Sequence, residues 1–175
     1  AYGNDKKNLS QFIQNSKNKP VISVYSSCWF DCPHLFGMNR FRDFYDWIKI
    51  TYECASNNTD FIWIFRAHPG DDWYGGVTLK DLLPKKLPSH IFLLPKEFSG
   101  KSVMDLSDGL VTYHSTAAIE YASQGKPVLV ADKGWYHDLD FVLYPKSRRE
   151  YIELLSQNWL SKVNIKKAKL ISKIF

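Results

Sequence analysis

The chain has no apolar run of membrane-spanning length, no stretch resembling a secretory leader and only three cysteines, Cys28, Cys32 and Cys54. An odd number of cysteines without a leader fits the reducing cytoplasm, so we expect a cytoplasmic protein without disulfides. Structural zinc needs four ligands in closely spaced pairs, and Cys28, Cys32 and His34 supply only three at poor spacing. We therefore predict no metal site.

An excess of basic residues over the whole chain is also missing. The net charge is +5, but residues 161–175 contain five lysines and no acid, which leaves 18 basic residues against 18 acidic ones elsewhere. A nucleic-acid groove needs a basic face spread over the fold, so we expect no nucleic-acid partner. The lysine-rich tail predicts either docking on another part of the protein or peripheral contact with the inner face of an anionic membrane.

What the chain does contain is an alternation of apolar strands and helical patterns. We predict strands at 21–25, 61–65, 91–94, 109–113 and 128–131, and helices at 41–55, 79–83, 102–106 and 147–158. A further helix begins with Ser115-Thr116 and ends before the Gly-Lys-Pro turn at 125–127. This order predicts an α/β fold with a doubly wound, parallel, Rossmann-like sheet. Asn39 is a candidate cap of the first helix.

Three regions follow from this pattern. Residues 1–19 form a polar segment, residues 20–160 the single folded domain, and residues 161–175 a basic amphipathic helix with Val163, Leu170, Ile171 and Ile174 as its apolar positions.

Ligands bind open parallel sheets at the carboxyl ends of the strands. Four histidines follow predicted strands and so share that edge: His34, His68, His114 and His137. His90 precedes its strand, and we expect it on the surface of the opposite edge. Loops are polar in general, so the alternative is that this clustering is incidental.

His68 and Arg66 end the second predicted strand. Pro69 restricts the backbone of His68 to extended geometry, which fixes an imidazole that can donate to a phosphate or a ribose hydroxyl. Arg66, two residues earlier, points to the same face. Its alternative role is a solvated charge or an ion pair within the fold.

The segment after the fourth strand predicts an anion site. Ser115 and Thr116 open a helix, where hydroxyls and free backbone N–H groups can hold a phosphate. Glu120 lies one turn further and can accept both hydroxyls of a ribose. The alternatives are an ordinary helix cap for the hydroxyls and, for Glu120, a solvated face or a salt bridge to Lys126 or Lys133.

The segment from Ser115 to Val130, with its Gly-Lys-Pro-Val turn, resembles the nucleotide-sugar-binding half of GT-B glycosyltransferases. His68-Pro69 combined with Ser115-Thr116 is similar to two motifs of CMP-sugar-dependent bacterial transferases, such as capsule Kdo transferases and sialyltransferases. Residues 30–34 followed by 44–48 also look like the capsule branch, so the resemblance covers roughly residues 20–158.

The resemblance implies the C-terminal, donor-binding half of such an enzyme, inactive alone, acting in capsule or other surface polysaccharide synthesis. Arg66, His68, His114, Ser115, Thr116 and Glu120 would contact a nucleotide-activated sugar, with a CMP-sugar favoured and no metal or other cofactor required. The N-terminal half, which binds the acceptor glycan or lipid-linked glycan and usually carries the general base, is absent. No catalytic residue is therefore predicted. Asp31, in the loop after the first strand, is the only local candidate base, and the alternative role that we favour for it is a capping acid of that loop.

Two other functions stay open. A CDP-alditol phosphotransferase of the teichoic-acid type also resembles the His-Pro and serine pattern. A non-catalytic nucleotide-binding module is the third reading.

Overall fold

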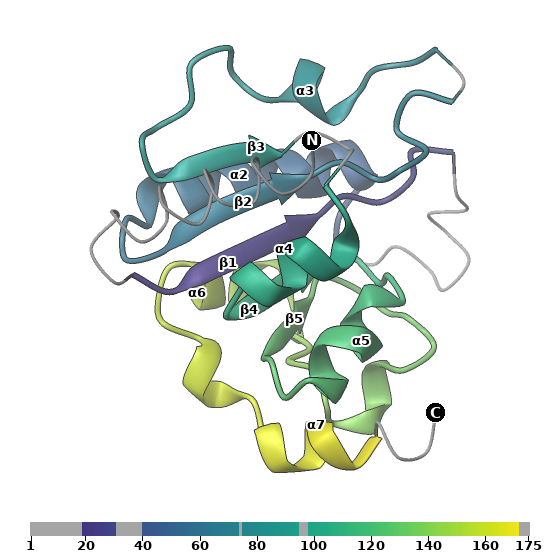
Figure 1. Cartoon of the computed structure of the whole chain (residues 1–175), viewed down its shortest axis with the longest axis vertical. Coiled ribbons are helices and arrows are strands. Elements are labelled where there is room, and N and C mark those ends of the chain that lie inside the picture. The colour runs from purple at the N-terminus through teal and green to yellow at the C-terminus, as the bar shows by residue number, and fades with distance from the viewer. Residues whose placement is uncertain (1–18, 31–39, 74, 95–97, 172–175) are drawn as a thin grey trace.

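The computed structural model describes residues 19–30, 40–73, 75–94 and 98–171. Its centre is a five-stranded, all-parallel sheet in the order β3-β2-β1-β4-β5 (Figure 1). The strands are β1 (Val21–Tyr25), β2 (Ile62–Arg66), β3 (Ile91–Leu94), β4 (Gly109–Thr112) and β5 (Val128–Val130). The predicted α/β, Rossmann-like doubly wound sheet is confirmed, because this strand order needs crossovers that run outward from β1 in both directions.

Helices cover both faces of the sheet (Figure 1). One face carries α2 (Phe44–Asn57), α3 (Leu79–Leu82) and α6 (Arg148–Leu155), and the other carries α4 (Gly100–Leu106), α5 (Ala117–Ser123) and α7 (Ile165–Ile171). Two short 3₁₀ turns, η1 (His137–Leu139) and η2 (Leu160–Lys162), complete the described elements. Burial on both faces explains why the strands read as continuous apolar runs such as Val21–Tyr25.

Besides shifts of two residues at the start of α4 and one residue at the start of α6, three helix starts differ from the prediction. Helix α2 begins at Phe44, and its cap is Asp43, whose carboxylate accepts the N–H of Asp46 at 2.7 Å; Asn39 lies outside the described residues. The tail is not one helix from Ser161, because η2 and an extended Val163 precede α7. The third difference concerns the start of α5 and is described with the site below.

The tail packs on the domain itself. Helix α7 lies against α5 (Figure 1), and the buried Ala168 belongs to the same apolar core as Ala118 and Tyr121 of α5. Leu170, predicted as a docking position, is 59% exposed. Within the described residues, no helix combines the length and the apolar character that crossing a bilayer requires.

Candidate functional site

The candidate site lies where the sheet changes direction. Strands β1 and β4 are neighbours although 87 residues separate Ile22 from its partner Gly109, and ligands bind α/β sheets in the crevice at such a switch point. Thr112 Oγ1 lies 3.4 Å from the carbonyl oxygen of Tyr25 and 3.1 Å from Ser115 Oγ. On the other side of β1, the N–H of His68 donates to Ser26 Oγ at 3.0 Å. The loops after β2 and β4 therefore meet at the end of β1.

The ring of His68 is held by its own turn. Nδ1 accepts the backbone N–H of Gly70 at 3.0 Å, which requires an unprotonated Nδ1. The neutral imidazole then carries its hydrogen on Nε2. His68 is half-buried, and it presents one N–H donor of fixed orientation, as an anion or hydroxyl ligand needs.

Arg66 stacks on Tyr25. Its guanidinium carbon lies 4.9 Å from the centre of the Tyr25 ring, and Nη2 donates to the carbonyl of Phe98 at 3.3 Å. Its buried Nε–H has no hydrogen-bond partner, and no carboxylate of the described residues pairs with it. The ion-pair alternative for Arg66 thus has no support within the described part of the chain.

Tyr25 also links Arg66 to the helix that carries Glu120. Its hydroxyl donates to the Gly100 carbonyl at 3.1 Å and accepts the Tyr121 hydroxyl at 3.2 Å. Burial and the neighbouring Tyr121 raise the pKa of Tyr25, and the charges of Arg66 and Glu120 act on it in opposite directions. Arg66 therefore contacts Tyr25 directly, and Glu120 precedes Tyr121, the α5 residue that bonds to Tyr25.

The start of α5 departs from the expected hydroxyl-capped helix. Thr116 occupies the cap position in helical geometry without a side-chain cap hydrogen bond, and Ser115 Oγ is engaged by Thr112 instead. The N–H groups of Ala118 and Ile119 already bond to the carbonyls of Ser115 and Thr116. Few backbone donors are therefore left for an anion, while the exposed hydroxyl of Thr116 makes no cap.

Glu120 is exposed and makes neither predicted salt bridge. The Lys126 ammonium donates to the carbonyls of Met104 and Ser107 at the end of α4, and burial lowers its pKa. The carboxylate of Glu120 is thus available on the first turn of α5.

Two of the edge histidines lie apart from this group. His114 packs its ring 5.1 Å from Tyr113 and 6.0 Å from Phe44, on the α2 side, beneath Gly134. His137 contacts the Gly134 carbonyl, Asp138 and the Tyr144 ring. His90, at the opposite edge as predicted, bonds through Nε2 to the Ala55 carbonyl at 3.0 Å. His34, Asp31 and Cys32 lie outside the described residues.

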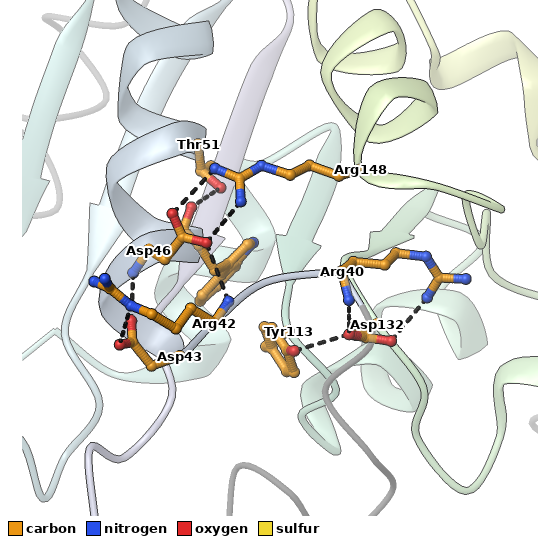
Figure 2. Close-up of polar contacts among 9 residues, drawn as sticks. Arg40, Arg42, Asp43, Asp46, Thr51, Tyr113, Asp132 and Arg148 are labelled. Carbon is orange, nitrogen blue, oxygen red and sulfur yellow. Dashed lines mark hydrogen bonds and ion pairs between the residues drawn. The ribbon is translucent and has the colours of Figure 1, made fainter.

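A buried ion pair that the sequence did not reveal fixes the end of β5. Asp132 is 0% exposed and binds Arg40 Nη1 at 2.8 Å, the Arg40 N–H at 3.2 Å and the Tyr113 hydroxyl at 3.0 Å (Figure 2). The only signal for it is an aspartate directly after a buried strand. Its partner is 92 residues away and carries no mark in the sequence.

A second missed contact joins the loops after β1 and β2. Trp29 Nε1 donates to one oxygen of the buried Asp71, and the N–H of Leu79 donates to the other at 2.8 Å. Burial raises the pKa of Asp71, whereas these two hydrogen bonds lower it. The part of the chain that the structure describes contains no group of three His, Cys, Asp or Glu side chains arranged to hold a metal ion.

Comparison with known proteins identifies structures of similar fold, but no family model and no curated protein of similar sequence. Among solved structures, it is similar to KpsC, a β-Kdo 2,4 transferase from Thermosulfurimonas dismutans, at 13% identity over 87% of this chain and 53% of that one (TM-score 0.57). The wall teichoic acid polymerase TagF matches at 15% identity over 97% of this chain and 42% of its own (TM-score 0.57).

An enzyme of another kind shares the same architecture. The UDP-GlcNAc 2-epimerase from Neisseria meningitidis, solved with UDP-GlcNAc bound, matches at 20% identity over 99% of this chain and 43% of its own (TM-score 0.54). The chain therefore spans about half the length of these proteins, and it has the α/β, Rossmann-like fold of one half of these GT-B neighbours.

Proposed function

We propose that this chain is the donor-binding domain of a glycosyltransferase in capsule or other surface polysaccharide synthesis. The donor is a nucleotide-activated sugar, with a CMP-sugar favoured. The observation that carries the proposal is the grouping of Arg66, His68, Ser115 and Glu120 around the end of β1, at the switch point of a GT-B-like half.

Each residue has a role on this proposal. His68 Nε2–H, Arg66 and the hydroxyls of Ser115 and Thr116 bind the phosphate, and Glu120 accepts the ribose hydroxyls. The reaction we propose is an inverting transfer of the sugar. Fixed donors of this kind stabilise the negative charge that develops on a leaving phosphate, so this transfer needs no metal ion. His114 is the weakest member of the predicted set, because its ring lies on the α2 side.

The acceptor, a glycan or lipid-linked glycan, is held by a second Rossmann-like domain on this proposal. The support is that the chain covers only 53% of KpsC and 42% of TagF.

The likeness to a teichoic acid polymerase favours one alternative, a CDP-alditol phosphotransferase. The same groups would then bind CDP, and the transferred group would be an alditol phosphate. Product analysis with the complete enzyme distinguishes the two reactions.

The test is titration of this chain with CMP, CDP and UDP, followed by calorimetry and amide NMR. We expect weak binding, with the largest shifts at residues 66–68 and 115–120, and tighter binding of the cytidine nucleotides. If none of the three moves these signals at millimolar concentration, the donor-binding proposal is wrong.

A further inference from the structure

An apolar groove opens on the α2 side of the same sheet edge and uses none of the proposed donor residues. It has a volume of about 400 Å³ and is lined by Trp29, Phe30, Phe44, Tyr45, Val77 and Leu82. Val77 is 59% exposed, and Phe30 and Tyr45 are 48% exposed. These residues come from the loops after β1 and β2 and from α2 and α3, so four segments build the groove.

The groove offers a ligand almost no polar partner. Among the described residues that line it, Asp43 alone carries a charge, and its carboxylate already accepts the Asp46 N–H at 2.7 Å and Arg42 Nε at 3.2 Å. A sugar or nucleobase would lose its hydration there without gaining hydrogen bonds. A hydrocarbon chain has no hydrogen bonds to water to lose, and removing its apolar surface from water is favourable.

A cationic hollow lies directly beside the groove and shares Tyr45 with it. It measures about 350 Å³ and is lined by Arg42, Lys49 and Arg148 together with Asp46. A smaller hollow of about 230 Å³ contains Tyr45, Lys49, Glu53 and Leu82 and so links the two.

More cationic than anionic side chains line this hollow. Arg148 donates two hydrogen bonds to Asp46, at 2.9 and 3.1 Å, and Arg42 Nε donates to Asp43 (Figure 2). Among the described residues, no ion pair joins Lys49 to a carboxylate. The cationic hollow is thus lined by three cations and by one carboxylate, Asp46, which Arg148 already engages, while Glu53 lines the smaller linking hollow. This excess of cations in the hollow favours an anionic group.

We propose that the groove and the cationic hollow together bind one amphiphile, a molecule with a hydrocarbon chain and a phosphate head. The chain lies among Phe30, Val77 and Leu82, and the head lies across Tyr45, at Lys49 and Arg42. The inference is independent of donor binding, because the two sites share no residue.

Calorimetry with single alkyl phosphates below their micelle concentration tests this. We expect n-octyl phosphate to bind at least tenfold more tightly than 1-octanol and than inorganic phosphate. Affinity should rise about fourfold for each methylene added from hexyl to decyl phosphate, the gain expected for burying one methylene. Amide NMR should place the shifts at residues 45–49 and 76–82.

Three exposed-site variants sharpen the test. Val77→Asp and Lys49→Glu should each weaken octyl phosphate binding at least tenfold, whereas Lys86→Glu, outside both hollows, should leave it unchanged. Lys49→Glu should not weaken 1-octanol binding. All three variants should bind CMP as the parent chain does. Loss of octyl phosphate binding with intact CMP binding therefore tests the amphiphile site separately from the donor site.

Three results would overturn the proposal. Equal binding of octyl phosphate and 1-octanol would leave no head site, and equal binding of octyl phosphate and inorganic phosphate would leave no chain site. Binding to phosphatidylglycerol vesicles without binding of the single amphiphile would make this face a bilayer contact instead.

Discussion

The chemistry of His68 depends on a turn that a single side chain closes. Its Nδ1 accepts the N–H of the residue two positions later, which is the hydrogen bond that an asparagine makes in an Asx turn. In His68, Nδ1 therefore holds the turn, whereas Nε2–H is the proposed donor to the ligand. A substitution can remove the second role and keep the first.

His68→Asn should keep the turn and remove the Nε2–H donor. We expect nucleotide binding to weaken by about 1–3 kcal/mol, the range for losing a hydrogen bond to a charged partner, with an unchanged Tm. Glu120→Ala should do the same, because Glu120 is exposed and makes no ion pair with Lys126 or Lys133. Calorimetry and thermal unfolding measure both effects, with His90→Asn and Glu53→Ala as controls; loss of stability with intact binding would assign either residue to the fold.

Asp132 is the residue on which we expect the largest single effect on stability. Asp132→Ala leaves Arg40 buried without its carboxylate, which should lower the unfolding free energy by about 3–5 kcal/mol. The double variant with Arg40→Met should recover part of this loss, since no unpaired charge remains. Urea unfolding of the parent chain and the two variants checks it, and a double variant no more stable than Asp132→Ala would contradict the ion-pair explanation.

The helix starts show which elements local sequence specifies. The Ser147 hydroxyl accepts the N–H of Glu150 at 3.1 Å and begins α6, whereas Thr116 begins α5 without such a bond. Both residues are exposed and both stand at a cap position, yet only one is a cap.

Ser147→Ala should therefore cost about 1 kcal/mol of stability, the usual value of a lost cap, and Thr116→Ala should cost less than about 0.5 kcal/mol. Denaturant unfolding of the two variants makes the comparison. A cost at Thr116 equal to that at Ser147 would mean that its hydroxyl caps α5 in solution.

Most elements could be predicted because their signals are local. Strand positions follow from apolar runs that are buried on both faces, and all five strands lie within one residue of their predicted ends. The start of α2 was misplaced because Asn39 and Asp43 are equally good caps on sequence alone. The tail helix was placed too early because Asn164, whose side chain accepts the N–H of Lys167 at 3.2 Å, starts α7 anew.

For the candidate site, the sequence predicts the edge of the sheet at which the residues gather, but not the contacts among them. Arg66, His68 and Ser115 follow strands, so the parallel sheet brings them to one side. Tyr25 as the link between Arg66 and α5, and Arg40 as the partner of Asp132, depend on contacts across 41 and 92 residues that no local pattern encodes.

Across the whole molecule, tyrosine hydroxyls are buried in both cores. On the α2 and α6 face, Tyr151 bonds with Trp47 and Thr51. On the α5 face, Tyr121 bonds with Ser23 and Tyr25. Burial raises the pKa of each of these three tyrosines, and also of Tyr113 and Tyr136.

This pattern predicts loss of stability at alkaline pH. A tyrosine whose pKa is higher in the folded state than in the unfolded chain, where it is about 10, keeps its proton on folding. Its contribution is complete below pH 10 and is lost as the pH rises above that value. Absorbance at 295 nm should show these five tyrosines ionising together with unfolding, as followed by circular dichroism; ionisation of all five in a chain that stays folded would contradict this.

The isolated chain should transfer no sugar, because the proposed function gives it one wall of a two-domain cleft. Incubation with CMP-activated sugars and glycan acceptors should yield no product while CMP still binds. Detectable transfer by these 175 residues alone would show that the acceptor site is complete without a second domain.

The central position of β1 also determines when the sheet can close during synthesis. One edge of β1 pairs with β2 about 40 residues later, but its other edge stays open until β4, 87 residues away, has left the ribosome. Contacts this distant in sequence form slowly, because a long loop must close first. A nascent chain that has reached only β3 carries an unpaired inner edge of apolar residues, which is the stage at which chaperone binding or mispairing with another copy is most probable.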